Sequence, residues 1–84
     1  MTLTIYSRPG CHLCDDMKAV VERVARAATP SPTIEVIDIS SDAALESRYG
    51  LEIPVLLVDG KKAAKYRVTE EGLRRMLKTA MANG

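Results

Sequence analysis

Two cysteines three residues apart, Cys11 and Cys14, restrict what this chain can fold into more than any other feature of its sequence. They lie between a predicted strand and a predicted helix, and their spacing puts both thiols in one helical turn. The helix directs its unsatisfied N–H groups and the positive end of its dipole at Cys11, which favours a thiolate there. A thiolate attacks disulfides, and a second thiol three residues on can release the partner. The sequence therefore predicts a redox site with Cys11 as nucleophile and Cys14 as resolving thiol.

The residues after Cys11 place the two thiols in different environments. Apolar side chains recur at helical spacing and predict one buried helix face, formed by Cys14, Met17, Val21, Val24 and Ala28. Cys14 begins this face. Cys11 precedes it at the start of the helix, where a partner can reach it.

Other interpretations of the two cysteines remain open. A purely structural disulfide would close so short a loop that it stabilises the fold by less than ~2 kcal/mol. A metal site needs three or four ligands, so the two cysteines and His12 would require Asp15 or Asp16, or a second chain, to complete it. The main alternative to a redox enzyme is therefore a module that binds zinc or an iron–sulfur cluster, as a dimer. A scaffold with a vestigial site is the third.

The length and composition predict one small domain with an aliphatic core. We expect residues 1–84 to form a single domain that buries about 60–65% of the surface of its unfolded chain. Phe and Trp are absent and only three tyrosines are present, so aromatic platforms for stacking nucleic acid bases are scarce. The net charge of +1 predicts no general attraction to nucleic acid or to membranes.

The charge is unevenly distributed along the chain. Residues 61–84 carry seven basic and two acidic side chains, a balance of +5, whereas residues 1–60 carry five basic and nine acidic ones, a balance of −4. This basic end is either a solvated face or a surface that attracts an acidic partner.

The first residues indicate no export signal, because a basic lead is missing and Arg8 follows within eight residues. No apolar run approaches the ~20 residues that cross a bilayer. We expect a cytoplasmic protein that binds no membrane and acts as a monomer. In that compartment a pair of cysteines is more often catalytic than structural.

Residue patterns predict the first elements of the chain. Residues 2–6 alternate polar and apolar side chains and predict a strand. A helix follows over residues 12–28, and two prolines within residues 29–32 prevent its continuation. Residues 33–39 are rich in Ile and Val, which predicts a strand buried on both faces.

A short second helix is predicted next. Ser40 and Ser41 offer an N-cap, with Asp42 just inside the helix. The helix is expected to end at Tyr49, with Gly50 following its last turn.

The last third of the chain predicts a hairpin and a helix. Residues 54–58 and 61–67 flank Asp59-Gly60, a dipeptide that supplies the positive φ angles of a tight turn. The lysines of the returning strand suit an exposed sheet edge. Thr69 is expected to cap the final helix. Its predicted buried face consists of Leu73, Met76, Leu77, Ala80 and Met81.

This order of elements, together with the Cys11-x-x-Cys14 motif and Ile53-Pro54 before the hairpin, resembles the glutaredoxin-like form of the thioredoxin fold. The resemblance covers about residues 2–81. It implies an α/β fold of the order βαβαββα, with a four-stranded mixed sheet and three helices. The implied activity is that of a thiol–disulfide oxidoreductase that reduces disulfide-containing proteins or glutathione mixed disulfides.

The resemblance also implies roles for residues near the dithiol. Pro54 would follow a cis peptide bond and face the cysteines, and the backbone of Ile53 would pair with a bound peptide or glutathione. Arg8 matches a basic residue that helps to hold a glutathione carboxylate and favours the thiolate. His12 would tune the redox potential or face water, and Leu13 would offer a partner a small apolar contact.

The chain also departs from the glutaredoxin pattern. Glutaredoxins typically follow the returning strand with two glycines and then an acid, whereas this chain has Ala64-Lys65 and Tyr66-Arg67. The usual contacts that bind glutathione are therefore expected to be weakened. No bound cofactor is expected, and either glutathione or a thioredoxin-reductase system would return the pair to the dithiol.

Overall fold

A computed structural model describes the backbone of residues 1–83 and the side chains of residues 1–80. Within this range the chain forms four strands, three α-helices and one 3-10 turn at residues 39–41. In chain order the elements are β1 (Thr2–Ser7), α1 (His12–Ala27), β2 (Thr33–Asp38), α2 (Ala43–Tyr49), β3 (Val55–Val58), β4 (Lys61–Lys65) and α3 (Glu70–Asn83). The predicted order βαβαββα is confirmed.

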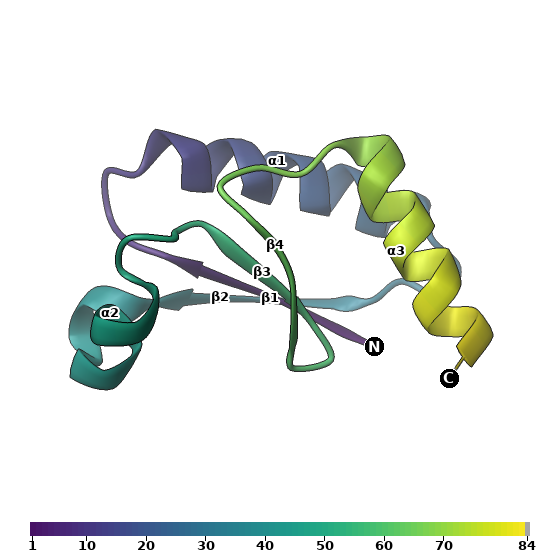
Figure 1. Cartoon of the computed structure of the whole chain (residues 1–84). Coiled ribbons are helices and arrows are strands. Elements are labelled where there is room, and N and C mark those ends of the chain that lie inside the picture. Colours follow the sequence, from purple (N-terminus) through teal and green to yellow (C-terminus); the bar gives the residue numbers. More distant parts are fainter. Residues whose placement is uncertain (84) are drawn as a thin grey trace.

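The strands form one mixed sheet in the order β2-β1-β3-β4. β1 runs parallel to β2 and antiparallel to β3, and β3 and β4 form the predicted hairpin. Figure 1 shows α1 and α3 together on one side of the sheet and α2 at the end of β2. The starts of α1 and β3 lie at that same end, on the left of the view.

The β3–β4 hairpin turns as its sequence predicts. Asp59 and Gly60 have φ angles of 50° and 83°, which suit a tight hairpin turn. The carboxylate of Asp59 also accepts a hydrogen bond from the N–H group of Thr2 at 2.8 Å. β4 lies at the edge of the sheet, as its lysines indicate, but it ends at Lys65 instead of residue 67.

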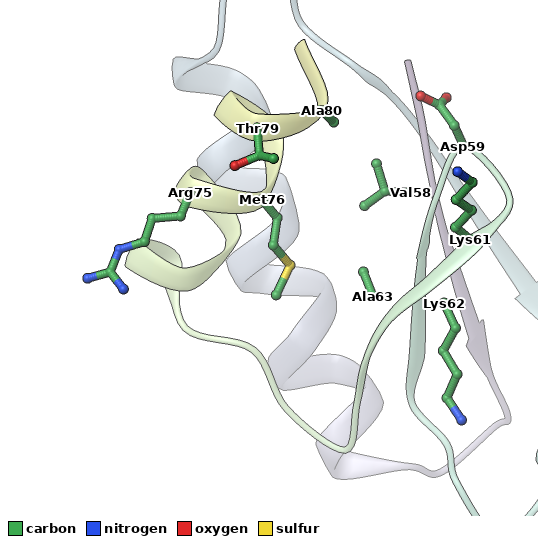
Figure 2. Close-up of a pocket in the computed structure, with 9 residues that line it drawn as sticks. All are labelled: Val58, Asp59, Lys61, Lys62, Ala63, Arg75, Met76, Thr79 and Ala80. Atoms are coloured by element: carbon green, nitrogen blue, oxygen red, sulfur yellow. The ribbon is translucent and has the colours of Figure 1, made fainter. Parts of the chain in front are cut away.

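A wide cavity of about 620 Å³ lies between this hairpin and α3. Figure 2 shows Val58, Ala63 and Met76 turned into the space, and Arg75 turned away from it. Small side chains at Ala63 and Ala80 leave this room. Val58 pairs with Leu3 near the start of β1, so the cavity is at the opposite end of the sheet from the cysteines.

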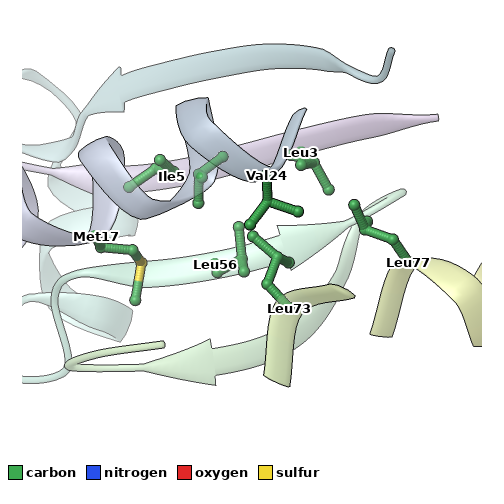
Figure 3. Close-up of a cluster of buried hydrophobic side chains, with 8 residues drawn as sticks. Leu3, Ile5, Met17, Val24, Leu56, Leu73 and Leu77 are labelled. Carbon is green, nitrogen blue, oxygen red and sulfur yellow. The ribbon is translucent and has the colours of Figure 1, made fainter. Parts of the chain in front are cut away.

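One apolar core joins the sheet to α1 and α3. Leu3 and Ile5 are two residues apart on β1, so their side chains share the face that the two helices cover. Leu56 on β3 lies beside Ile5 (Figure 3). α1 contributes Met17, Val21 and Val24, and α3 contributes Leu73 and Leu77.

The predicted buried faces of the helices need small corrections. Ala28 is not part of the buried face of α1, because the helix ends at Ala27 and Ala28 has an extended backbone; Ala25 is buried instead. On α3, Leu73 and Leu77 are buried, whereas Met76 and Ala80 are half-buried. The side chain of Met81 lies outside the described residues.

The prediction that residues 33–39 form a strand buried on both faces is wrong. β2 ends at Asp38 and occupies an edge of the sheet, where it pairs only with β1 and leaves Val36 43% exposed. Ile39 is buried, but in the following 3-10 turn. The β-branched residues of β2 therefore reflect strand propensity and not burial on both faces.

The start of α2 also differs from the prediction. Ser40 and Ser41 belong to the 3-10 turn, and Asp42 is the N-cap, accepting hydrogen bonds from the N–H groups of Ala44 and Leu45 at 3.0 and 3.1 Å. The cap at Thr69 is confirmed, because its hydroxyl accepts the N–H of Gly72 at 3.0 Å.

Within residues 1–83, none of the helices combines the length and the apolar composition that crossing a membrane requires.

Candidate dithiol site

Cys11 and Cys14 lie at the start of α1 and form a disulfide, with their Cα atoms 5.2 Å apart. Cys11 is the N-cap residue, and Cys14 lies in the first helical turn. Gly10 precedes Cys11 and has a φ angle of +78°, which residues with a side chain rarely adopt. The local sequence thus brings both sulfurs to the mouth of the helix.

The two cysteines differ in burial, as the periodicity predicts. Cys14 is only 4% exposed and packs with the buried face of α1, whereas Cys11 is partly exposed. The Sγ atom of Cys11 accepts a hydrogen bond from the N–H group of Cys14 at 3.1 Å. A helix N-terminus that donates to a sulfur favours its thiolate once the pair is reduced.

The sheet brings Pro54 to the same end as the cysteines. Tyr6 on β1 pairs with Val55 on β3, so Ser7 and Pro54 each lie one residue beyond this pair. Pro54 is buried and Ile53 is half-buried, and the peptide bond between them is cis, as the resemblance implies. The loop from Ser7 to Cys11 therefore begins beside Pro54.

Arg8 is engaged within the chain. Its guanidinium forms an ion pair with Glu46 of α2 and lies 3.5 Å from the carbonyl oxygen of Gly50. Both side chains of the pair are more than a third exposed, so solvent screens their attraction. This contact ties the loop before Cys11 to α2, and sequence reasoning missed it because 38 residues separate its partners.

Gly50 allows this contact because it lacks a side chain. A Cβ atom at this position would lie 2.5 Å from the carbonyl oxygen of Glu46, and 3.2 Å from the guanidinium of Arg8. The residue has a φ angle of −55°, so glycine is needed here for space and not for a left-handed backbone.

The two residues between the cysteines, His12 and Leu13, are both exposed. They are therefore available to a partner that approaches Cys11. Within the described chain, no three side chains of His, Cys, Asp or Glu gather closely enough to hold a metal ion.

A cavity of about 260 Å³ reaches the buried cysteine. Arg8, Cys14, Lys18 and Asp38 are among the residues that line it. The hydroxyl and N–H groups of Ser40 donate to the carboxylate of Asp38 and hold its pKa below the ordinary value. The cavity is smaller than the one beside α3, but it is the one that adjoins the dithiol.

Comparisons with known proteins agree with this geometry. Residues 2–78 match the family model described as "Glutaredoxin-like domain (DUF836)". A curated relative from Dictyostelium discoideum, "Glutaredoxin-like protein YDR286C homolog", is 28% identical over an alignment of 85 positions that covers 96% of this chain and 79% of the relative.

Solved structures of similar fold include two bacterial proteins. XcR50 from X. campestris is 36% identical, with a TM-score of 0.75 over 92% of this chain and 96% of that one. Ne2328 from Nitrosomonas europaea is 28% identical, with a TM-score of 0.74 and coverage of 89% and 88%. A thioredoxin variant from Halobacterium salinarum is 25% identical, with a TM-score of 0.64 and coverage of 93% and 72%.

Proposed function

The chain belongs to the glutaredoxin-like domain family and has a thioredoxin fold, and from this we propose that it is a thiol–disulfide oxidoreductase. The observation that carries the proposal is the pairing of a partly exposed Cys11 with a buried Cys14 at the N-terminus of α1. Membership and a Cys-x-x-Cys pair support thiol redox chemistry. The reaction, its substrates and its location in the cytoplasm are proposed here.

The proposed reaction moves two electrons from the dithiol to a partner disulfide. The thiolate of Cys11 attacks one sulfur of the partner, forms a mixed disulfide and releases the partner's other sulfur as a thiolate. Cys14 then loses its proton and attacks the Sγ atom of Cys11. This step releases the second partner thiol and leaves the Cys11–Cys14 disulfide. Glutathione or a thioredoxin-reductase system returns the disulfide to the dithiol.

Both disulfide-containing proteins and glutathione mixed disulfides are proposed substrates. The surroundings of the site favour the proteins. Arg8, the expected partner of a glutathione carboxylate, is already paired with Glu46. Arg67 is basic where glutaredoxins typically carry an acid. The roles of Ile53 and Pro54 in binding a substrate backbone remain part of the proposal.

Two serine substitutions test the roles of the cysteines. We expect Cys11→Ser to abolish reduction of a model disulfide, because the remaining cysteine, Cys14, is only 4% exposed and cannot begin the reaction. We expect Cys14→Ser to keep the first attack and to accumulate a mixed disulfide, detectable by intact-protein mass spectrometry. Turnover is measured with glutathione and, separately, with a thioredoxin-reductase system.

A control separates these roles from a general loss of folding. Each variant should keep the far-UV circular dichroism of the reduced parent. If Cys11→Ser reduces the disulfide as fast as the parent, or if Cys14→Ser never forms the mixed disulfide, the assignment is wrong. Wild-type activity in both variants would show that the two cysteines do not carry the reaction.

A further inference from the structure

Large apolar side chains are exposed at the dithiol end of the molecule. Leu51 is 94% exposed, Tyr66 is 42% exposed and Leu13 is 40% exposed. They come from three separate segments: the loop before β3, the residue after β4 and the first turn of α1. None of these side chains belongs to the buried core, so all three are available to a binding partner.

Hydrogen bonds fix Tyr66 and Leu51 next to each other. The N–H group of Tyr66 donates to the carbonyl oxygen of Pro54 at 2.8 Å, and its hydroxyl donates to the carbonyl oxygen of Leu51 at 3.2 Å. Pro54 in turn lies opposite Ser7 on the neighbouring strand, because Tyr6 pairs with Val55. Ser7 is the last residue of β1 before the loop that leads to Cys11. Tyr66 and Leu51 therefore flank the cis-proline at the end of the sheet that holds the dithiol.

The backbone of Tyr66 is strained. Its φ angle is +70°, a left-handed conformation that costs a bulky side chain about 1–3 kcal/mol. The two hydrogen bonds maintain it, and the Nζ atom of Lys65 lies 5.5 Å from the ring centroid. Strain retained at the dithiol end of the sheet, on a side chain that is 42% exposed, indicates a function in binding.

The surroundings of these two apolar side chains are basic. Glu52 follows Leu51, and its ion pair with Lys62 holds its pKa below the ordinary value, with further contributions from Lys65 and Arg48. The charge of the Glu52 carboxylate is thus offset by three neighbouring cations. Arg67, which follows Tyr66 in the chain, is also exposed. An acidic partner would meet a favourable potential here.

We propose that Leu51 and Tyr66 form an apolar docking surface for an acidic segment of a disulfide-containing protein. An apolar side chain of that segment packs on Leu51 and Tyr66, while its acidic residues lie near Arg48, Lys65 and Arg67. The cysteine of the segment then meets Cys11. The inference rests on the proposed function and narrows its substrate class to proteins.

The test uses chromogenic probes that need no external reductant. Each probe is a short acetylated peptide whose cysteine forms a mixed disulfide with thionitrobenzoate. The reduced protein transfers two electrons to this disulfide, releases thionitrobenzoate and the peptide thiol, and becomes the Cys11–Cys14 disulfide. The probes carry leucine or serine beside the cysteine, with aspartate or lysine flanks. N-acetylcysteine amide bearing the same leaving group is the reference.

The substitution Leu51→Ser is the main variant, because so exposed a side chain can be changed without disturbing the fold. We expect it to slow reduction of the leucine–aspartate probe by about tenfold and to leave the reference probe unchanged. Leu51→Met, which keeps the apolar volume, should restore the parent rate. In the parent, the aspartate probe should react faster than the lysine probe, and added salt should reduce this difference.

The outcomes separate this inference from the proposed function. If the protein reduces the reference probe but Leu51→Ser slows no peptide, or slows the reference equally, the docking surface is refuted. Equal rates for the aspartate and lysine probes at low salt refute the acidic partner. Failure to release thionitrobenzoate from any probe refutes the oxidoreductase itself.

Discussion

At the scale of single residues, the contact between Arg8 and Glu46 changes the electrostatics expected at the site. Arg8 alone, three residues before Cys11, would stabilise a thiolate by its positive charge. Its pairing with Glu46 adds a carboxylate nearby and offsets part of that effect. The charge near the nucleophile therefore depends on a side chain from α2.

Substitutions of this pair should act in opposite directions on Cys11. We expect Glu46→Gln to speed alkylation of the reduced protein by iodoacetamide at neutral pH, by about two- to threefold, because a negative charge is removed. Arg8→Gln should slow it by a similar factor. The rate is followed by mass spectrometry, with Glu22→Gln on the distant half of α1 as a control.

A shift in the same direction for both variants would show that the contact acts by holding the loop in place and not by charge. Only opposite shifts support the electrostatic account.

The structural features that the sequence predicted correctly arise from local geometry. Cys11 and Cys14 follow from their spacing and from the start of a helix, and the turn at Asp59 and Gly60 follows from their backbone preferences. Glu46 could not be found in this way, because its partner is remote in the chain and no spacing rule joins them.

At the scale of elements, α2 is attached differently from the other helices. None of residues 43–49 is buried, whereas α1 and α3 both contribute to the core. α2 is held by the ion pair of Glu46 with Arg8 and by the ring of Tyr49, whose centroid is 4.9 Å from that of Tyr6. Both contacts are at its surface.

We therefore expect α2 to open more readily than α1. Amide hydrogens of residues 47–49, which lie within the hydrogen-bonded turns of α2, should exchange faster than those of residues 19–25 of α1, because few buried apolar contacts resist local opening. Hydrogen exchange measured by NMR tests this. Equal protection of the two segments would contradict it.

The differences between predicted and observed elements have two separate causes. Residues 33–39 have high strand propensity, but whether a strand is central or at an edge depends on its neighbours, which no local pattern specifies. The cap of α2 shifted from Ser40 and Ser41 to Asp42 because three polar residues that can all cap a helix follow one another. The 3-10 turn occupies the first two.

At the scale of the whole molecule, the order of elements came from local patterns, but the arrangement of strands came from the resemblance to a known fold. Alternation on β1 indicates that Leu3 and Ile5 share a face, yet it does not say that β3 lies beside them. The single core joins β1, β3, α1 and α3, so we expect these elements to unfold together.

Leu56 occupies the centre of that core and is fully buried. Leu56→Ala should lower the free energy of unfolding by about 3 kcal/mol through lost burial and a residual cavity. The total free energy of unfolding is on the order of 4–13 kcal/mol for a chain of 84 residues, so this loss is a large part of it. Urea denaturation measures it.

Leu51→Ala is the matched control, since the same atoms are removed from an exposed leucine. Its effect should stay within about 0.5 kcal/mol. Similar losses for the two variants would contradict the position of Leu56 in the core.

The sulfur of Cys11 is both the proposed point of attack and the acceptor for the N–H group of Cys14. Every change of its bonding therefore alters the magnetic environment of one backbone amide. In a proton–nitrogen correlation spectrum, the Cys14 resonance should move separately for the dithiol, the disulfide and the alkylated protein. A single peak would then serve as an internal redox indicator, readable in mixtures without any added dye.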